Sequence, residues 1–354
     1  MLVEVEGRAG SSIPGVKKLS VGVIGAGDIA RTAHLPVLTQ CENISVDWLA
    51  DVNRGNAASL AKAYKTECLP LTENLKELPA ADVVLLACPY GVRQPYYEML
   101  SERGSAIYAE KPLARTAAEH DSICAMFPDW ALASGLMMRA WSSNLMAREA
   151  IGAGIFGDLR RASYSHGRPG LVTGGRYYLD PAQGGGGMLA EFGIHGVDSV
   201  LYACQAAAAE VERVHSVREG KVDLHTEAAI AMRLPGKQDA VFDVTVTGLA
   251  NVFEGVELEF DDAILSYLLP GQGYALHGDI IDMDVTVRPA RGGPGYRLSP
   301  AIPGVYPSTK FQMFHEFWTR FLDGVREQKP NWTSAREARL TTAVIEGIEK
   351  GGSS

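Results

Sequence analysis

The chain has 354 residues, of which 46% are hydrophobic and 21% charged, and its formal net charge is −9. This length predicts two domains, and the negative charge, without any block of lysine and arginine, argues against nucleic-acid and anionic-membrane partners. No apolar run is long enough to span a bilayer, and the five cysteines contain no Cys-x-x-Cys pair, which favours reduced thiols in a cytoplasmic protein over a disulfide framework or a zinc site.

The first 139 residues alternate between short apolar runs and helix-like segments. Residues 1–18 are polar and acidic and lack the apolar stretch of a signal peptide, so we expect a flexible leader. Five runs then predict strands, at Ser20–Ile24, Ile44–Ala50, Asp82–Cys88, Ser105–Ala109 and Ala131–Ser134. Four helices are expected between them, at Asp28–Thr39, Asn56–Tyr64, Val92–Arg103 and Thr116–Met126. The alternation over residues 19–139 predicts an α/β domain with a doubly wound parallel sheet.

The pattern changes after Arg139. Helices are expected at Ser143–Ile151 and Met188–Cys204, with a strand at Asp158–Ser165 between them. Five further runs alternate apolar and polar residues, at Ala229–Leu234, Ala240–Thr247, Val252–Phe260, Ala263–Leu269 and Asp282–Arg288. Residues 140–332 therefore predict a second α/β domain with a large open, mostly antiparallel sheet that is covered on one face.

The chain ends in two segments with helical periodicity, Phe311–Phe321 and Ser334–Ile348. We assign the second of these to a separate C-terminal part of the chain, residues 333–354.

A glycine-rich motif lies between the first predicted strand and the first predicted helix. Residues 25–30 read Gly-Ala-Gly-Asp-Ile-Ala and match the G-x-G-x-x-A dinucleotide fingerprint. Gly25 would permit the tight turn, and Gly27 would let the backbone approach a pyrophosphate at the helix N-terminus. Together with Asp28 and Ile29, they are candidate cofactor-binding residues of a Rossmann domain.

The second predicted strand ends in Asp51, close to where an acidic residue binds the ribose hydroxyls of NAD. A helix cap or turn is the alternative role for this residue. Asp51 would repel the 2′-phosphate of NADP, so NAD is favoured. Arg54 keeps NADP open, because a nearby arginine can accept that phosphate.

Two further segments carry candidate catalytic residues. Glu110-Lys111-Pro112 follows an apolar strand, so Lys111 is expected in the crevice where doubly wound folds bind ligands. Gly184 to Gly187 precede a predicted helix that carries Glu191 and His195, and these glycines would allow close approach to a ligand. Glu191 and His195 are spaced i, i+4 and share a helix face, with a surface pair or a core histidine as the alternatives. No third residue nearby suggests a metal site.

These motifs together resemble the glucose-fructose oxidoreductase, inositol dehydrogenase and MocA (Gfo/Idh/MocA) family, and the resemblance covers Leu19 to the C-terminus. It rests on the glycine motif, on Cys88, Pro89 and Tyr90 at the turn where the family has a T-P-N-like sequence, on Glu110-Lys111-Pro112, and on the segment from the glycine run to His195. Glu191 departs from the aspartate usual in the family, and Arg93 stands where a histidine is common.

The resemblance implies an NAD(P)-dependent oxidoreductase that exchanges a hydride with a secondary alcohol or ketone of a sugar, sugar derivative or cyclitol. By this resemblance His195 is the general base, Lys111 stabilises the alkoxide, and Glu191 orients the substrate or the base. The segments Ala87–Tyr90 and Glu110–Lys111 would border the cofactor. Polar and aromatic side chains that could line the substrate pocket are Arg139, Trp141, Arg176 and Tyr178.

The family resemblance also implies a homodimer or homotetramer formed through the C-terminal sheet, and a final helix that packs back on the Rossmann domain. Two alternative functions stay open. One is a glycosidase that uses transient oxidation by NAD, and the other is a non-catalytic NAD-binding regulator of the same fold.

Overall fold

The computed structural model describes residues 15–72, 74–170, 180, 186–269, 284–299 and 306–351. The chain forms two compact units, which we call unit 1 and unit 2. Unit 1 comprises Met1–Leu113, Asp121–Gly135 and Phe314–Glu337, and unit 2 comprises Ala114–His120, Leu136–Met313 and Ala338–Ser354. Within the described ranges, no helix has both the length and the apolar character needed to cross a membrane.

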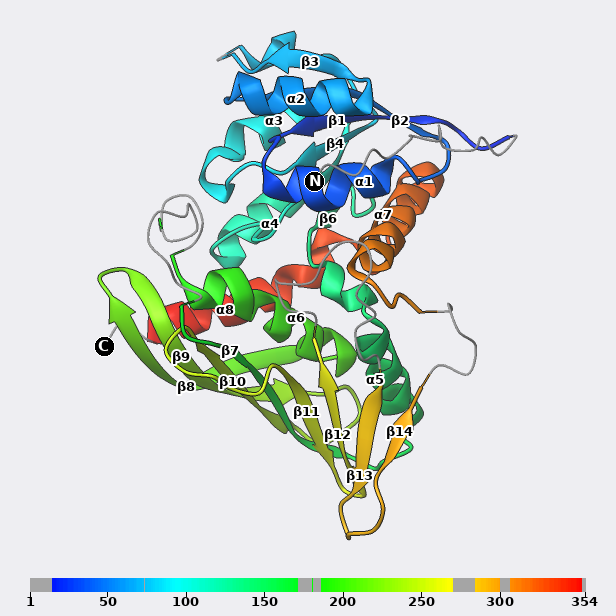
Figure 1. The fold of residues 1–354 in the computed structure, drawn as a ribbon. Coiled ribbons are helices and arrows are strands. Elements are labelled where there is room, and N and C mark those ends of the chain that lie inside the picture. The colour runs from blue at the N-terminus through cyan, green and yellow to red at the C-terminus, as the bar shows by residue number, and fades with distance from the viewer. Residues whose placement is uncertain are drawn as a thin grey trace. The chain divides into compact units, whose positions relative to one another are not determined.

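Unit 1 contains six parallel strands in the order β3-β2-β1-β4-β5-β6 (Figure 1). Their bounds are β1 Leu19–Ile24, β2 Ile44–Asp51, β3 Glu67–Pro70, β4 Val83–Leu86, β5 Ala106–Ala109 and β6 Leu132–Ser134. The predicted doubly wound sheet is confirmed. The edge strand β3 escaped prediction because most of its residues are exposed and lack an apolar pattern. Chain order reverses between β1 and β4, which is where open α/β sheets bind ligands at their carboxyl ends.

The first helix of unit 1 is not a regular α-helix. It contains a π-helical turn, Ala30–His34, followed by α1, Leu35–Leu38. Pro36 has no backbone N–H, so one regular helical hydrogen bond is missing at this point. The N–H of Leu35 bonds to the carbonyl of Ala30 instead. The side chain of His34 is fully buried in the unit.

Two further helices of unit 1 have ordinary ends. Helix α2, Arg54–Tyr64, begins at Asn53, whose side chain accepts the N–H groups of Gly55 at 3.0 Å and Asn56 at 3.2 Å. Helix α3, Gln94–Arg103, ends at Gly104 in the left-handed conformation. Helix α4 spans Ala117–Ala125.

Helix α7, Lys310–Glu327, contributes an aromatic cluster to the core of unit 1. Trp318 stacks on Tyr108 of β5 with ring centroids 4.5 Å apart, and Phe317 and Phe321 meet the same tyrosine ring edge-on. A helix near the C-terminus thereby helps to build the core beneath the end of β5.

Unit 2 contains eight strands in the order β14-β13-β12-β11-β7-β10-β9-β8 (Figure 1). All pairs are antiparallel except β7 with β10. The bounds are β7 Leu159–Gly167, β8 Ala208–Glu219, β9 Val222–Arg233, β10 Ala240–Thr247, β11 Gly255–Phe260, β12 Ala263–Leu268, β13 Val285–Pro289 and β14 Tyr296–Leu298. The large, mostly antiparallel sheet is confirmed.

One face of this sheet is covered, as its alternating residues predict. In β10, Phe242, Val244 and Val246 are buried, whereas Val241 is 39% exposed. Helices α5, Ser142–Ala153, α6, Ile194–Ala203, and α8, Arg339–Gly351, lie along the covered face (Figure 1).

Helix α8 packs on β8 and α6 within unit 2. It also bonds α4, a helix that the sequence counted with the Rossmann domain: Glu346 accepts the N–H of Ala117 at 2.7 Å, and the Thr342 hydroxyl lies 2.8 Å from Nδ1 of His120. Small residues allow the close packing on β8. A Cβ at Gly347 would lie 2.9 Å from Val211, and one at Gly351 would lie 2.9 Å from Val214. The preceding segment, Phe314–Glu337, belongs to unit 1, and it includes the first residues of the predicted C-terminal part.

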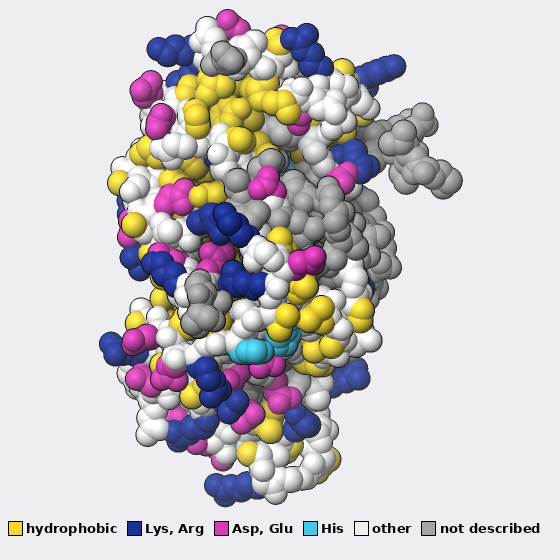
Figure 2. Space-filling model, turned by 90° about the vertical axis from the view of Figure 1, so that its left-hand side faces the viewer, with side chains coloured by type: hydrophobic (Ala, Val, Ile, Leu, Met, Phe, Trp, Pro, Cys, Tyr) yellow, Lys and Arg dark blue, Asp and Glu magenta, His cyan; other side chains and the backbone are white. Residues whose placement is uncertain are grey.

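The charged side chains seen in Figure 2 are interspersed, and neither sign forms a continuous patch on this face. On the outer side of the unit 2 sheet, for example, Arg161 pairs with Asp243 at 2.7 Å and Arg288 with Glu257 at 2.7 Å.

Candidate functional site

The two glycines of the fingerprint serve different purposes in the loop after β1. Gly25 has φ +102°, and a Cβ there would lie 2.6 Å from the carbonyl carbon of Ala87 and 2.7 Å from the nitrogen of Cys88. Gly25 is therefore required where the ends of β1 and β4 pass each other. A Cβ at Gly27 would meet nothing within 4 Å, so this stretch of backbone stays open to a ligand.

Asp51 connects the glycine loop with the loop after β2. One carboxylate oxygen accepts the N–H of Ala26 at 2.6 Å, and the other accepts the N–H of Asn53 at 2.6 Å. Each oxygen has a second lone pair, so the carboxylate can still accept a ribose hydroxyl. Its turn-anchoring role is thus present in the structure and compatible with the expected role in cofactor binding. Arg54 begins α2 three positions later and is exposed.

Arg93 holds the turn after β4 against the segment after β5. It is 3% exposed, and it donates to the carbonyl oxygens of Cys88 at 2.9 and 2.7 Å, Pro112 at 2.9 Å, and Glu110. In the sequence, Arg93 was notable only because it replaces a histidine that is common in the family. Its role as an anchor between the two segments is visible only in the structure. Burial raises the pKa of the Cys88 thiol despite the nearby Arg93, so the sulfur stays protonated at neutral pH.

Glu110 is buried at the carboxyl end of β5 and is bonded from two sides. One carboxylate oxygen lies 2.8 Å from Nε2 of His34, and the other accepts the N–H of Lys111 at 3.1 Å. Lys111 itself is half-buried. Unit 1 therefore gathers the cofactor candidates Gly25, Gly27, Asp51, Cys88, Glu110 and Lys111 at the carboxyl ends of β1, β2, β4 and β5.

In unit 2, Glu191 and His195 are both buried, with 9% and 8% exposure. Glu191 lies in a π-helical turn, Leu189–Gly193, and His195 lies in the first turn of α6, which continues it. The structure thus places both predicted residues on one continuous helical segment.

The glycine run before this helix has a structural reason that the sequence did not reveal. Gly187 has φ +145°, and a Cβ there would lie 2.2 Å from a carboxylate oxygen of Asp223 and 2.7 Å from its backbone nitrogen. The group that approaches Gly187 closely is therefore Asp223, near the start of β9. Gly184 and Gly185 lie outside the described residues.

The end of β7 lies against the helix that carries the predicted base. A Cβ at Gly196 would lie 2.1 Å from the Tyr164 ring, so the backbone next to His195 rests directly on this strand. Two residues further along β7, the His166 ring stacks on Phe192 at 5.1 Å. Both contacts depend on side chains that point to the same face of β7.

His166 is a residue that the sequence analysis missed. It is 8% exposed, and in the described part of the chain its Nε2 has no hydrogen-bond partner. Burial lowers the pKa of His166, as does Arg168, while Glu254 opposes the shift. A polar residue on the covered face of a strand was the signal that could have identified it.

Arg139 and Trp141, two of the substrate candidates, are interior residues of unit 2. Arg139 is 3% exposed and makes two hydrogen bonds to Asp198, at 2.8 and 2.7 Å, and Thr341 donates to the same carboxylate at 2.8 Å. Asp198 lies one turn after His195 on α6, so this network fixes the helix. Trp141 is fully buried. Arg176 and Tyr178, the other candidates, lie outside the described residues.

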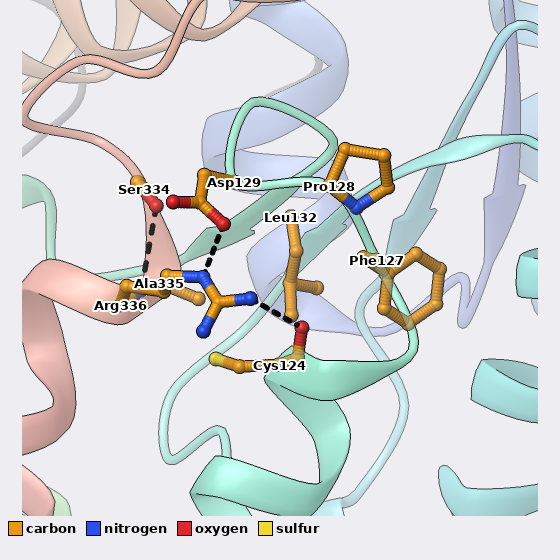
Figure 3. Close-up of a pocket in the computed structure, with 8 residues that line it drawn as sticks. All are labelled: Cys124, Phe127, Pro128, Asp129, Leu132, Ser334, Ala335 and Arg336. Carbon is orange, nitrogen blue, oxygen red and sulfur yellow. Dashed lines mark hydrogen bonds and ion pairs between the residues drawn. The ribbon is translucent and has the colours of Figure 1, made fainter.

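A shallow surface depression, too small to enclose a water molecule, lies elsewhere in unit 1 (Figure 3). Arg336 lines it, pairs with Asp129 and donates to the carbonyl of Cys124 at 3.2 Å. One of its lining residues is Leu132, the first residue of β6. The depression therefore lies near the amino ends of the parallel strands, whereas the cofactor candidates lie at their carboxyl ends. Across the described ranges, no cluster of three or more histidine, cysteine or acidic residues could hold a metal ion.

Two family models match two successive parts of the chain. Residues 19–129 match the model described as oxidoreductase family, NAD-binding Rossmann fold, and residues 144–260 match the GFO/IDH/MocA C-terminal domain. Together the two matches span more than half of the sequence.

Two curated relatives are sugar oxidoreductases by name. A dTDP-3,4-didehydro-2,6-dideoxy-alpha-D-glucose 3-reductase of Streptomyces antibioticus is 27% identical over 231 residues, which cover 61% of this chain and 68% of the reductase. A D-glucoside 3-dehydrogenase of Escherichia coli K12 is 25% identical over 206 residues, which cover 57% of this chain and 58% of the dehydrogenase.

Solved structures share the fold over almost the whole chain. The aldose-aldose oxidoreductase of Caulobacter crescentus, complexed with glycerol, is similar with a TM-score of 0.77 and 17% identity, over 95% of this chain and 98% of that one. A 3-ketoreductase of Actinomadura kijaniata, in complex with NADP and TDP-benzene, gives a TM-score of 0.75 with 16% identity and the same coverage.

Proposed function

Because the chain belongs to the Gfo/Idh/MocA oxidoreductase family, we propose that it transfers a hydride between a nicotinamide cofactor and a secondary alcohol or ketone of a sugar, sugar derivative or cyclitol. The observation that carries the proposal is the position of Lys111. Lys111 follows the carboxyl end of β5. The open backbone at Gly27 and the carboxylate of Asp51 lie at the same edge of the sheet, where the parallel strands end. That edge is where a doubly wound sheet binds its dinucleotide.

The residues of unit 1 fit an NAD cofactor. Gly27 to Ile29 would bind the pyrophosphate at a helix N-terminus, Asp51 the ribose, and Cys88, Pro89, Tyr90 and Glu110 would border the nicotinamide side. Bound cofactor would supply the hydride acceptor. NAD is the proposed cofactor, and the exposed Arg54 keeps NADP possible.

The proton chemistry is assigned to three side chains. His195 takes the hydroxyl proton during oxidation and returns it during reduction, because an imidazole titrates near working pH. The ammonium of Lys111 stabilises the developing alkoxide. Glu191 orients the substrate or the base. Arg176 and Tyr178 remain the proposed substrate contacts. Arg139 and Trp141 are buried, so they are not proposed to touch the substrate; Arg139 acts indirectly, through its bonds to Asp198 of α6.

The names of the relatives narrow the substrate to test first. Both the Streptomyces antibioticus reductase and the Escherichia coli dehydrogenase are named for position 3 of a glucose derivative. We therefore propose hexose C3, free, glycosidic or nucleotide-linked, as the first candidate for the reacting carbon. Cyclitols are the second group to test.

The deciding experiment is turnover of purified protein with sugars, glycosides, cyclitols and nucleotide-linked sugars, each with NAD and with NADP. We expect net formation of reduced cofactor with at least one alcohol, or its consumption with the matching ketone. Release of a free sugar without net reduced cofactor would support the glycosidase alternative. Cofactor binding without any turnover would support the regulator.

Two further features of the protein belong to this proposal. The outer face of the unit 2 sheet would form the interface of a homodimer or homotetramer, and measurement of the mass in solution tests this.

The five cysteines are free and occur in both units, which favours a reducing compartment, so we place the enzyme in the cytoplasm.

A further inference from the structure

A buried polar chain in unit 1 connects the C-terminal helix α7 with the segment that carries Lys111. The indole N–H of Trp318 donates to Nδ1 of His34 at 3.0 Å, and Nε2 of His34 lies 2.8 Å from the carboxylate of Glu110. Trp318 and His34 are fully buried, and Glu110 is 6% exposed. The second carboxylate oxygen of Glu110 accepts the backbone N–H of Lys111 at 3.1 Å.

The direction of these bonds is fixed by chemistry. An indole N–H can only donate, so Nδ1 of His34 must be the acceptor. Its ring proton therefore resides on Nε2, which donates to Glu110. His34 belongs to the helix that follows the glycine motif. The chain of bonds therefore also joins this helix to the end of β5.

The surroundings leave the histidine and the carboxylate little freedom to move. The His34 ring is surrounded by Tyr108, Phe314 and Trp318, with centroids at 5.0, 5.2 and 5.9 Å. A Cβ at Gly135 would lie only 3.1 Å from a carboxylate oxygen of Glu110, so the backbone closes the other side. Rigid support of this kind is what a precisely placed functional group requires.

The charge of Glu110 follows from the groups that face it, which are His34, Arg93, Lys111 and, from its own strand, Tyr108. Burial alone would raise its pKa, but the hydrogen bond from His34 and the charges of Lys111 and Arg93 outweigh burial and lower the pKa of Glu110. Burial, with a smaller effect from Glu110, raises the pKa of Tyr108 well above its usual value, so that neighbour stays neutral. Glu110 is thus a buried carboxylate held in its ionised form.

We propose that Trp318, His34 and Glu110 form a positioning relay for Lys111, with His34 as its central residue. The relay holds an ionised carboxylate beside the strand end, and this carboxylate fixes the backbone from which the lysine ammonium projects toward the reacting oxygen. The inference rests on the proposed function, because it assigns the relay its purpose through the role of Lys111 in turnover.

A pair of substitutions at His34 tests the relay. His34→Leu removes the donor to Glu110, and we expect kcat to fall about tenfold to a hundredfold, with NAD affinity preserved. Without that hydrogen bond the pKa of Glu110 should rise, so the acid limb of the pH–rate profile should move to higher pH. His34→Gln can donate an amide N–H from nearly the same position, and it should restore both kcat and the acid limb.

Two further variants separate positioning from a general loss of packing. Glu110→Gln keeps the shape of the carboxyl group without its charge, and it should lower kcat and remove the acid limb that depends on Glu110. His120→Leu is the matched control: this fully buried histidine bonds Thr342 at 2.8 Å in unit 2, and its loss should leave the acid limb in place. Wild-type kcat and pH profile in both His34→Leu and Glu110→Gln would overturn the proposal.

A measurement without substrate distinguishes failure of the relay from failure of the proposed function. In protein with ¹⁵N-labelled histidine, NMR should show His34 with its proton on Nε2 and an unprotonated Nδ1. Trp318→Phe removes the indole donor, and the Nδ1 resonance should then change. A wild-type His34 protonated on Nδ1 would overturn the relay even if the enzyme is active. The expected tautomer in a protein that turns over no substrate would leave the bonds standing, but would overturn the purpose that we assign to them.

Discussion

Asp223 accepts the backbone N–H of Leu189 at 3.0 Å and thereby caps the helical segment that carries Glu191 and His195. The carboxylate comes from the start of β9, more than thirty positions further along the chain. Its own backbone N–H bonds to the carbonyl of Gly186 at 3.2 Å, so the end of the glycine run and the β8–β9 hairpin are tied together. The position of the predicted base in unit 2 therefore depends on a hairpin that has no catalytic residue of its own.

Gly187→Ala should destabilise unit 2. The new Cβ would lie 2.2 Å from Asp223 in a backbone conformation that L side chains rarely adopt, so we expect a loss of about 2–4 kcal/mol. Gly220→Ala in the same hairpin is the control, since it also has positive φ but meets nothing within 4 Å, and it should cost only about 1–2 kcal/mol. Urea unfolding of both variants measures the difference, and equal losses would contradict the packing argument.

Asp223→Asn should increase stability at neutral pH. Burial raises the pKa of Asp223, although the N–H of Leu189, Arg218 and the hydroxyl of Thr226 oppose the shift. The folded state therefore binds this proton more tightly than the unfolded state, and the contribution favours folding at low pH and is lost as the pH rises through the folded pKa. Asparagine keeps an acceptor for Leu189 without the charge, so its advantage over aspartate should grow from about pH 4 to pH 7.

The control for this pH series has the opposite sign. The hydrogen bond from Arg160 lowers the pKa of Asp261, so Asp261→Asn should lose stability relative to wild type as the pH rises. Thermal unfolding of both variants across the pH range measures the two slopes. Parallel slopes would contradict the assignment of Asp223.

The two fingerprint glycines should respond differently to alanine. Gly25→Ala places a Cβ 2.6 Å from the backbone of Ala87 at positive φ, so it should impair folding of unit 1. Gly27→Ala meets open space, so stability should be retained while NAD affinity falls, because the methyl group occupies the approach to the backbone. Unfolding curves and NAD titrations of each variant decide this. Unchanged NAD affinity in Gly27→Ala would remove the loop from the cofactor site.

Lys111→Ala and His195→Ala should each lower kcat about a hundredfold to ten-thousandfold while leaving NAD affinity nearly unchanged. The reason is that the first loses the charge that stabilises the alkoxide and the second loses the base. Steady-state kinetics on the substrate found in the panel, together with NAD titration, measure both effects. Normal turnover in either variant would disprove its assigned role.

Asp51 is expected to select the cofactor as well as to anchor its loop. Asp51→Ala should weaken NAD binding and shift preference toward NADP, because it removes both the ribose acceptor and the repulsion of a 2′-phosphate. Asp51→Asn keeps one acceptor for the backbone at Ala26 or Asn53, so it isolates the effect of charge. Kd values for both cofactors report the result. An unchanged preference in both variants would leave Asp51 as a turn residue only.

Much of the architecture could be predicted from local patterns. The β4 and β10 sequences show why: the first is apolar on both faces, as a central parallel strand must be, and the second alternates as a half-covered strand does. Strand β8 escaped prediction because its residues are mostly exposed or half-buried, which leaves no apolar period to detect. The contacts of α8 with β8 and α6 could not be predicted either, because an apolar helix face does not specify which sheet it will cover.

The sequence by itself determined the two α/β units, the dinucleotide loop and the identity of the chemical groups, because each depends on residues close together in the chain and on the intrinsic preferences of those residues. Only the tertiary structure decided what holds those groups. The partner of His34 is Trp318, the partner of Arg139 is Asp198, and the group that requires Gly187 is Asp223. Such pairs join residues far apart in the chain through buried polar groups that must find partners, and no local pattern records which partner the fold will supply.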